Sequence, residues 1–486
     1  MDKSLRFDWF ETLEIDLLDD LTSKVLLVID LDRSTKNQSF GQLQAQRNRD
    51  TEVTRHLLSA LYQSFFIAPV GTHRVSIPTS ASAYTRRGDG LLPLKFSYRS
   101  VMRVLSTLKQ LDWVQVEAGN TFKGVTRMSA SGKLVAIFSN TGLQWYPQRP
   151  KPPEMLVVVR DRSELKENVK VELPTPQTQE VDNYRSFLLR YNSFLLQHCV
   201  GLALSDNQLR GLSHNTGLGS INLFRLQLRR IFSRGSLTMG GRFYGGWWQS
   251  LPSLYRPHIT IDGYRTTEVD YSSVALRILY ASQGAEVSPD KDLYDIGLPS
   301  WEGRHDPRRK LIKTFLNAVL NDESGAYRLP RSDLKKIGVS HRCLMTLLRQ
   351  RHEPIAHLFN TTAGLEAQFI DSEIAMMVMQ KMMDEEILVL PIHDSFIVRV
   401  GHRSTLNDVM LESFQAVTGR LTSTSETGPS TKELFGTDIE KTDIESRSRV
   451  ITLEEAFDSE IKMPSGLMHD FVASWRRYHY ARNTYK

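Results

Sequence analysis

Two aspartates, Asp270 and Asp394, have the residue type and the surroundings that chemistry at a buried site requires. Apolar runs on both sides of Asp394, within residues 388–398, predict two short buried strands joined by a tight turn. Asp270 ends another predicted strand, residues 266–270, and a helix is expected to follow over 273–282. A carboxylate held among apolar strands is costly unless it meets a cation, a metal or a substrate proton. The two aspartates are therefore candidates for one shared metal site.

Phosphoryl transfer is the chemistry that suits such a pair. Two carboxylates on neighbouring strands can bridge divalent ions about 3.5–4 Å apart, which activate an attacking hydroxyl and stabilise the leaving oxygen. Mg²⁺ takes few protein carboxylates and completes its coordination with water and phosphate oxygens. The remaining requirement is positioning and cationic cover for the phosphates.

A basic helical face supplies candidate cations. Arg309, Lys313 and Asn317 recur at steps of four within a helix predicted over 307–321, which places two cations and an amide on one face. Such a stripe is most often a solvated face. Here it precedes a second predicted helix, residues 367–385, that leads into the turn of Asp394.

A glycine-rich and aromatic run, residues 240–252, contains Arg242 and Gln249. Glycine lets a backbone approach a ligand closely, and Arg242 would then point at that ligand. The alternative is an aromatic packing corner, and the run alone favours neither interpretation.

Taken in order, these motifs resemble the palm and fingers of family A DNA polymerases, and they are also similar to phage-type single-subunit RNA polymerases. The shared order is Gly-Arg, Leu-Pro and Arg, then Asp-Tyr-Ser-x-x-x-Leu-Arg, then Arg-x-x-x-Lys, then Gln and His-Asp-Ser. The resemblance covers residues 236–402. It implies an α+β fold built as a right-hand polymerase with palm, fingers and thumb.

The resemblance also implies roles for individual residues. Asp270 and Asp394 are the implied catalytic and metal-binding residues, holding two Mg²⁺ ions, with Mn²⁺ as an alternative. The implied nucleotide-binding residues are Arg309, Lys313, Asn317, Tyr271 and Ala275. The implied nucleic-acid-binding residues are Arg242, Gln249, Gln368 and His393. The implied partners are a DNA primer–template and nucleoside triphosphates.

Departures from the family pattern concern the choice of sugar. Ala275 stands where family A DNA polymerases usually carry a glutamate, and Asn317, Asn321 and Asp322 replace an aromatic residue and a Tyr-Gly pair. That glutamate and tyrosine help to exclude a ribose 2′-hydroxyl. We expect a DNA polymerase of replication or repair with relaxed sugar selectivity. An RNA polymerase or primase-like enzyme, and a non-catalytic DNA-binding replication initiator, are the alternatives.

A second candidate nucleic-acid surface lies near the N-terminus. Ser97 can cap a helix that is apolar on one face and carries Arg99 and Arg103 on the other. Strands predicted at 113–116 and 133–138 complete a pattern that resembles a winged-helix module, whose basic helix enters a DNA groove. The alternative is a small α+β subdomain with a solvated basic face.

The expected domain organisation begins with an α+β region and ends with a C-terminal extension. Residues 25–32 are interpreted as a strand ending in Asp30 and Asp32, without the companion carboxylates of a proofreading exonuclease. The expected segments are an α+β region over 1–145 with the winged-helix-like module at 90–140, a linker over 146–180, a helical thumb-like segment over 181–235 with helices at 183–204 and 220–233, palm residues 236–290, fingers 291–360, palm residues 361–405, and an extension over 406–486 with a mobile segment at 422–448. A basic and aromatic run at 475–482 suits single-stranded nucleic acid or a packed final helix.

Bulk composition excludes several classes. The 486 residues carry a net charge of +6, which permits a polyanionic partner, and are 40% hydrophobic and 24% charged, as in ordinary soluble proteins. The two cysteines exclude a disulfide framework and a cysteine-built zinc site. No apolar run approaches the roughly 20 residues of a membrane helix. The first residues lack the apolar core of a signal peptide, so we expect a cytoplasmic protein without a membrane partner.

Overall fold

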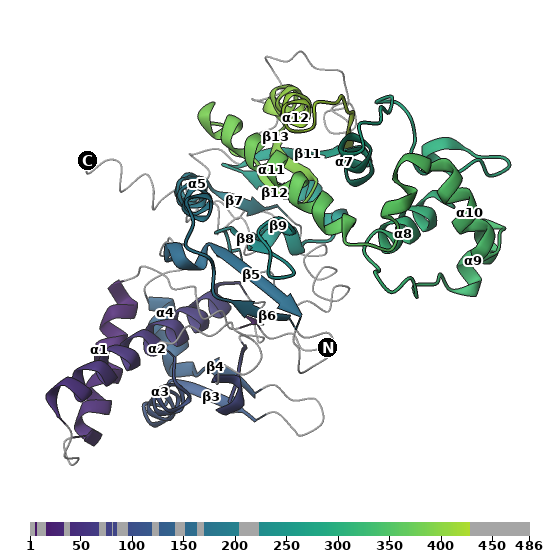
Figure 1. Ribbon diagram of the computed structural model, residues 1–486. Coiled ribbons are helices and arrows are strands. Elements are labelled where there is room, and N and C mark those ends of the chain that lie inside the picture. The colour runs from purple at the N-terminus through teal and green to yellow at the C-terminus, as the bar shows by residue number, and fades with distance from the viewer. Residues whose placement is uncertain are drawn as a thin grey trace.

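The computed structural model shows a mixed α+β fold with helices and several sheets (Figure 1). The residues that the structure describes are 5–6, 16–33, 39–67, 74–79, 81–84, 96–118, 126–140, 151–162, 170–203 and 223–427. The mixed α+β class agrees with the expectation from sequence. The basic and aromatic run at 475–482 lies outside the described residues.

The N-terminal part packs helices against a small sheet. Its helices are α1 (Asp16–Arg33), α2 (Phe40–Ile67), α3 (Tyr98–Gln110) and α4 (Gly132–Asn140), with a 3₁₀ turn at Ala81–Tyr84. Its strands are β1 (Leu5–Arg6), β2 (Val75–Ile77), β3 (Val114–Glu117) and β4 (Thr126–Ala130), in the order β1-β2-β4-β3. The predicted cap is confirmed, because the Ser97 hydroxyl accepts from the Ser100 N–H at 3.1 Å. The strand predicted at 113–116 is confirmed as β3.

Two strand predictions in this part are wrong. Residues 25–32 belong to α1, because Leu18, Leu21, Val25 and Ile29 recur every three or four positions and are buried. Residues 133–138 belong to α4, while β4 lies earlier in the chain. The strand that the winged-helix interpretation requires at 133–138 is therefore a helix.

A second sheet has the strand order β6-β5-β8-β9. Its members are β5 (Val157–Arg162), β6 (Lys170–Leu173), β8 (Arg229–Phe232) and β9 (Gly240–Tyr244), and a 3₁₀ turn at Pro153–Met155 precedes β5. The linker interpretation of 146–180 is wrong for β5 and β6, and the helix predicted at 220–233 is wrong for β8. Proline-rich composition concealed β5, although Val157, Val158 and Val159 are buried. Helix α5 (Gln179–Leu195), capped by Thr178, confirms the helix predicted from 183, but β7 occupies its predicted end.

The third sheet contains the strands that carry the two aspartates. Its order is β12-β13-β11-β10-β7, with β14 also paired to β11. The strands are β7 (Val200–Leu202), β10 (Ile259–Ile261), β11 (Tyr264–Tyr271), β12 (Leu390–Ile392), β13 (Ser395–Arg399) and β14 (Thr424–Thr427). The strands predicted around Asp270 and Asp394 are confirmed. The mobile-segment interpretation of 422–448 is wrong for β14, and residues 428–448 lie outside the described part of the chain.

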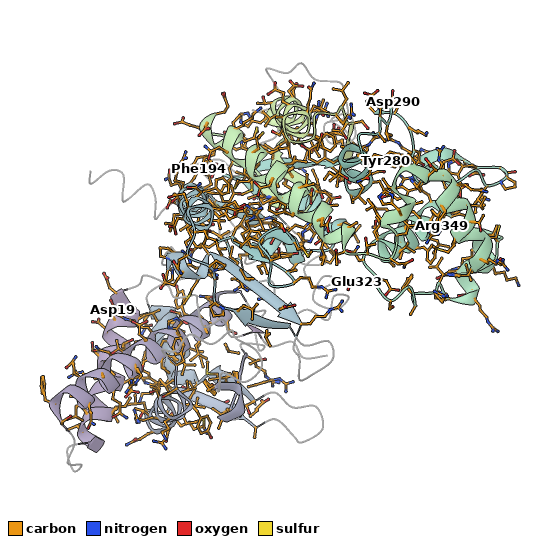
Figure 2. The ribbon with its side chains drawn as sticks, viewed as in Figure 1. Asp19, Phe194, Tyr280, Asp290, Glu323 and Arg349 are labelled. Carbon is orange, nitrogen blue, oxygen red and sulfur yellow. The ribbon has the colours of Figure 1, made fainter. Side chains whose placement is uncertain are left out.

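Helices cover this sheet and extend beyond it. Helices α7 (Val274–Ser282), α11 (Ala363–Asp384) and α12 (Arg403–Thr418) pack together, and α11 also contacts β9. Helices α8 (Arg309–Val319), α9 (Arg331–Ile337) and α10 (His341–Arg351) form a separate helical unit at one side, where Figure 2 labels Arg349. The 3₁₀ turns in this half are Trp247–Ser250, Ser253–His258, Gly303–His305, Glu353–Leu358 and Val400–His402. The predicted helices at 273–282, 307–321 and 367–385 are confirmed as α7, α8 and α11.

Among the described helices, none combines the length and the apolar character needed to cross a lipid bilayer.

Candidate active site

The pairing of β11 with β13 brings Asp270 and Asp394 together. The strands are antiparallel and place Asp270 opposite Ser395, the residue that directly follows Asp394. The Tyr271 N–H donates to the Asp394 carbonyl at 3.2 Å. Two carboxylates that are far apart in sequence thus lie at the same end of two adjacent strands.

Both aspartates lie beside residues with left-handed backbone. His393 has φ +58° and turns β12 into β13, and Ser273 has φ +56° where β11 gives way to α7. Such backbone is uncommon for residues other than glycine, although asparagine, aspartate and histidine adopt it more often than the rest. The strain is held in place by the surrounding packing, including the T-shaped contact of the His393 and Tyr244 rings at 5.5 Å.

Trp248 and Gln249 fix the strand before His393. The Trp248 indole N–H and the Gln249 amide each donate to the Pro391 carbonyl, at 3.1 and 3.0 Å. The Gln249 side-chain oxygen accepts from the Gly245 N–H at 3.0 Å. In this conformation Gln249 therefore positions β12, and its predicted contact with nucleic acid stays a prediction.

The electrostatics of the aspartate pair favour a cation. Burial, together with the charge of Asp394, raises the pKa of Asp270 to about 8, whereas Lys313 opposes the shift. Burial also lowers the pKa of His393, and nearby arginines add to this. Two partly buried carboxylates that oppose each other in this way suit divalent ions, whose charge would relieve the repulsion.

Asp371 is a buried carboxylate beside this pair that was missed in the sequence. It is 2% exposed and accepts from Arg242 Nε at 2.8 Å and from Nη2 at 2.7 Å. Burial raises its pKa to about 6, Arg242 opposes the shift and Asp394 adds to it. The available signal was its place on α11 three residues after Gln368, because positions i and i+3 share a helical face.

Arg230, on β8 of the β8–β9 hairpin, joins that hairpin to the same turn of α11. Its guanidinium is fully buried and donates to the Gly241 carbonyl at 2.7 Å, to Ser372 Oγ at 2.7 Å and to Glu373. It also lies 4.1 Å from the centre of the Tyr184 ring. Two arginines of β8 and β9 thus hold three consecutive residues of α11, which fixes Asp371 beside the aspartate pair.

The glycine-rich run is a packing corner. A Cβ at Gly241 would lie 2.9 Å from Phe232 and 3.0 Å from Ser372 Oγ, so the close approach is between parts of this chain. Trp247 and Trp248 are buried. The interpretation that these glycines admit a ligand is not supported for Gly241.

Arg309 and Lys313 lie where the sequence predicts, on one face of α8. Arg309 donates to both oxygens of Asp292, at 3.0 and 3.1 Å. Lys313 is exposed, and its charge acts on Asp270. Asn317, one turn further, is exposed and accepts at its carbonyl from the Asn321 side chain at 2.8 Å.

Tyr294 connects these cations and was also missed. Its ring centre lies 4.8 Å from the Arg309 guanidinium carbon and 5.9 Å from Lys313 Nζ. Burial raises the pKa of Tyr294 to about 12, while a hydrogen bond with Ser273 and the charge of Arg309 oppose the shift. No periodicity in the sequence marks this single aromatic residue in a loop.

Two other predicted nucleotide-binding residues differ in their placement. Tyr271 points to the opposite face of β11 from Asp270, is 2% exposed and donates its hydroxyl to the Met410 carbonyl. In this structure the Tyr271 side chain therefore packs in the core, and its predicted contact with a nucleotide stays a prediction. Ala275 is partly buried in the first turn of α7, and Gln368 is partly buried on α11.

A fourth carboxylate, Glu268, lies two residues before Asp270 on the same face of β11. It accepts from Ser395 Oγ at 2.6 Å and from Arg256 Nη1 at 2.8 Å, so both of these partners use its oxygen Oε1. Within the described ranges, no three His, Cys, Asp or Glu side chains form a group that could hold a metal ion.

Arg99 and Arg103 are not brought to this site. Both lie on α3, which Figure 1 shows at the other end of the molecule from β13. Arg103 Nη1 donates to both oxygens of the fully buried Asp50, at 2.9 Å each, whereas Arg99 is exposed. Arg103 thus has a structural partner, and the contact of both arginines with DNA stays a prediction.

No protein-family model and no curated protein matches the sequence. Among solved structures, the chain is similar to the POL domain of Pol1 from M. smegmatis, in complex with DNA primer-template and dNTP. The identity is 12%, the TM-score is 0.30, and the match covers 51% of this chain and 52% of that chain. The chain therefore spans about half the length of that structure. A likeness of this extent determines neither fold nor function, which have to be argued from the residues themselves.

Proposed function

We propose that the chain is a template-directed nucleotidyltransferase, specifically a DNA polymerase of the family A type without a proofreading exonuclease. The observation that carries this proposal is the β11–β13 register, which places Asp270 beside Asp394. The motif order described for the sequence supports it, with the third sheet as palm and α8–α10 as fingers. The substrates would be a DNA primer–template and nucleoside triphosphates.

Asp270 and Asp394 would hold two Mg²⁺ ions, with Mn²⁺ as the alternative. The fit rests on their place at the same end of two adjacent strands, their partial exposure and the raised pKa of Asp270, which burial and the charge of Asp394 cause. Bound ions would activate the attacking hydroxyl and stabilise the leaving oxygen. Hard oxygen ligands of this kind are those that Mg²⁺ prefers.

The chain's own cations would position the triphosphate. Lys313 is exposed and near enough to Asp270 to act on its charge, so a phosphate bound between them would meet both. Arg309 is oriented by Asp292 and by the Tyr294 ring, which limits where its guanidinium can donate. Positioning of this kind, rather than covalent chemistry, is what the protein contributes to phosphoryl transfer.

Arg242 and Asp371 would support the primer side of the site. Their ion pair lies next to Asp394, whose charge acts on both side chains. A primer that approaches Asp394 would therefore meet a guanidinium whose orientation Asp371 already fixes. Gln368, on the same face of α11 as Asp371, would lie beside the primer–template duplex.

The small side chain of Ala275 favours relaxed sugar selectivity. It also favours the second candidate function, an RNA polymerase or primase-like enzyme, because no carboxylate at this position would exclude a nucleotide with a ribose 2′-hydroxyl. A non-catalytic replication initiator is less well supported. Opposed carboxylates raise the free energy of the folded state, and a protein that only binds DNA has no use for them.

Primer extension tests the proposal. The full-length protein with Mg²⁺, an annealed primer and dNTPs should extend the primer, and Asp270→Asn or Asp394→Asn should abolish extension while DNA binding persists. Glu286→Gln is the matched control, because Glu286 is an exposed carboxylate paired with Arg420 at 2.8 Å. Parallel reactions with rNTPs, with and without primer, separate the two candidate functions. Undiminished extension by both aspartate variants would reject the site.

A further inference from the structure

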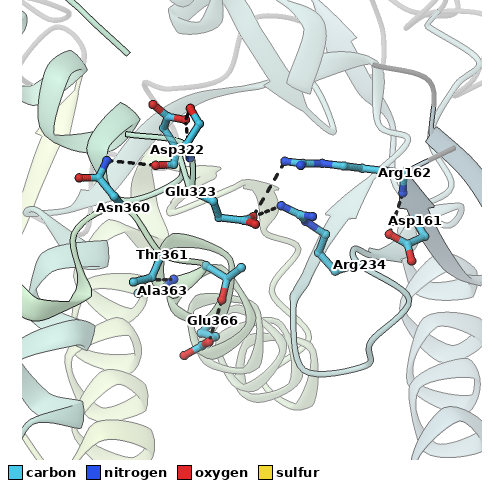
Figure 3. A network of polar contacts seen from close by, with 11 residues as sticks. Asp161, Arg162, Arg234, Asp322, Glu323, Asn360, Thr361, Ala363 and Glu366 are labelled. Carbon is cyan, nitrogen blue, oxygen red and sulfur yellow. Dashed lines mark hydrogen bonds and ion pairs between the residues drawn. The ribbon is translucent and has the colours of Figure 1, made fainter. Parts of the chain in front are cut away.

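Glu323 joins the helical unit α8–α10 to the second sheet (Figure 3). It lies in the loop after α8, and its carboxylate forms ion pairs with Arg234 and, at 3.9 Å, with Arg162. Arg234 lies in the turn between β8 and β9, and Arg162 is the last residue of β5. Figure 2 shows Glu323 between the two parts of the chain. One carboxylate thus bridges segments that are distant in sequence.

The two arginines are neighbours because of the sheet register. β5 and β8 run parallel with Val159 opposite Phe232, so Arg162 and Arg234 follow at the same end of adjacent strands. The Gly235 N–H donates to the Arg160 carbonyl at 3.0 Å, which fixes the turn against β5. The Arg162 side chain is 66% exposed and that of Arg234 is 23% exposed. They form a basic pair at an accessible sheet end.

Glu323 is presented to this pair by an ordered loop. The Asp322 carboxylate accepts from the Ser324 N–H at 3.1 Å and from the Tyr327 N–H at 2.6 Å. The Asn360 side chain donates to the Asp322 carbonyl at 3.0 Å, and the Asn360 N–H donates to Val319 at 2.8 Å. These contacts tie the loop to both ends of its own helical unit, so Glu323 meets the arginines in a defined place.

At this contact two guanidinium groups share the carboxylate of Glu323. Asp161 is the neighbouring acid, and its Oδ1 accepts from the Arg162 N–H at 2.7 Å. Arginine binds carboxylate and phosphate with the same planar fork of donors, and an ion pair between exposed groups contributes little to stability. A phosphate could therefore replace Glu323 without a large loss in folding free energy.

The same sheet leads from this pair to the aspartates. β8 pairs with β9, and at the far end of β9 the Tyr244 ring contacts His393, the residue before Asp394. A nucleic-acid strand whose end lay at the aspartates would follow this sheet toward Arg162 and Arg234. Successive phosphates lie several ångströms apart, so one can reach the basic pair while the strand end stays at the site.

We propose that Arg162 and Arg234 bind a phosphodiester of the nucleic-acid strand, and that Glu323 occupies their guanidinium groups in the free protein. The inference rests on the proposed function, since it requires a nucleic-acid substrate. Binding exchanges the carboxylate of Glu323 for a phosphate. The exchange also releases the α8–α10 unit from the second sheet, so that substrate entry and movement of this unit are coupled.

Salt-dependent DNA binding tests the proposal. Anisotropy of a labelled primer–template duplex, titrated with the full-length chain at several salt concentrations, gives both affinity and salt slope. Arg162→Gln and Arg234→Gln should each lower the slope of log K against log salt by about 0.9, because each lost phosphate contact removes one released counterion. Glu323→Gln should raise DNA affinity about threefold, the size expected when a competing exposed ion pair is removed.

Matched controls come from another exposed ion pair, Arg190 with Asp384 at 3.4 Å. Arg190→Gln and Asp384→Asn make the same charge changes and should leave slope and affinity as in the wild type. If Arg234→Gln does not fold, the exposed Arg162 carries the slope measurement. Unchanged slopes and an unchanged Glu323→Gln affinity, in a protein that binds and extends a primer, would overturn this inference alone. A wild type that neither binds nor extends would reject the proposed function as well.

Discussion

Arg242 and Asp371 face each other beside the aspartate pair, with two guanidinium nitrogens at 2.8 and 2.7 Å from one carboxylate oxygen. Asp371 is almost completely buried, and Arg242 is the charged group that compensates its burial. The contact crosses from β9 to α11, so it also sets the distance between the hairpin and the helix. A buried pair of this kind is most sensitive to the loss of one partner.

Asp371→Asn should therefore destabilise the protein. The charged hydrogen bonds to Arg242 become neutral, and we expect the free energy of unfolding to fall by about 1.5–3 kcal/mol. Urea denaturation measures the change, and Asp384→Asn, at an exposed site, should stay within about 0.5 kcal/mol of the wild type. Equal stability of the two variants would contradict a structural role for the pair.

His352 should give the stability a defined dependence on pH. It is fully buried beside Tyr280, and burial lowers its pKa from 6.5 to about 4. The unfolded chain therefore binds a proton that the folded chain excludes, so stability decreases as the pH falls from about 6.5 to about 4. His352→Gln should reduce this slope by up to one proton, measured as unfolding free energy against pH. His305→Gln, at an exposed histidine, is the control and should preserve the slope.

Tyr294 should influence the binding of triphosphates through the cations above its ring. Loss of the ring in Tyr294→Leu removes contacts with Arg309 and Lys313 that are worth about 0.5–2 kcal/mol, which corresponds to about a two- to thirtyfold rise in KM for dNTPs. Tyr294→Phe keeps the ring and loses only the hydroxyl, so its KM should stay closer to the wild type. Equal KM values for Tyr294→Leu and the wild type would show that the ring does not orient the cations.

Ala275→Glu should restore sugar discrimination. A carboxylate in the first turn of α7 would lie near the site and oppose a ribose 2′-hydroxyl, so we expect the ratio of ribonucleotide to deoxyribonucleotide incorporation to fall at least tenfold, a transition-state difference of about 1.4 kcal/mol. Single-nucleotide extension with each sugar measures the ratio, and Ala275→Gln controls for side-chain size. An unchanged ratio would assign discrimination to another residue, with Asn321 as the next candidate.

The strands that carry the aspartates could be predicted because a short stretch of residues determines each of them. Apolar runs interrupted by a polar turn mark β12 and β13, and helical spacing marks α8. The same reasoning failed at residues 25–32, where a continuous apolar run in α1 resembles a strand. It also failed at β5, where flanking prolines suggested a linker.

Residues that act through tertiary contacts could not be predicted in this way. Tyr294 and Glu323 lie in loops without periodicity, and their partners come from other elements. The ion pair of Arg242 with Asp371 required knowing that β9 lies against α11. Tyr271 is the converse case. The sequence motif predicted that it contacts a nucleotide, whereas the alternation of side chains along β11 places it in the core.

The pairing of β14 with β11 places residues that follow α12 beside the strand that carries Asp270. Ser425 lies opposite Asp270 on one edge while Ser395 lies opposite it on the other. If the chain were shortened before residue 424, backbone N–H and C=O groups of β11 would lose their partners in β14. They could then pair with an extended peptide, including one from a second copy of the chain. Truncation here would thus remove an intramolecular strand pairing and favour self-association directly beside Asp270.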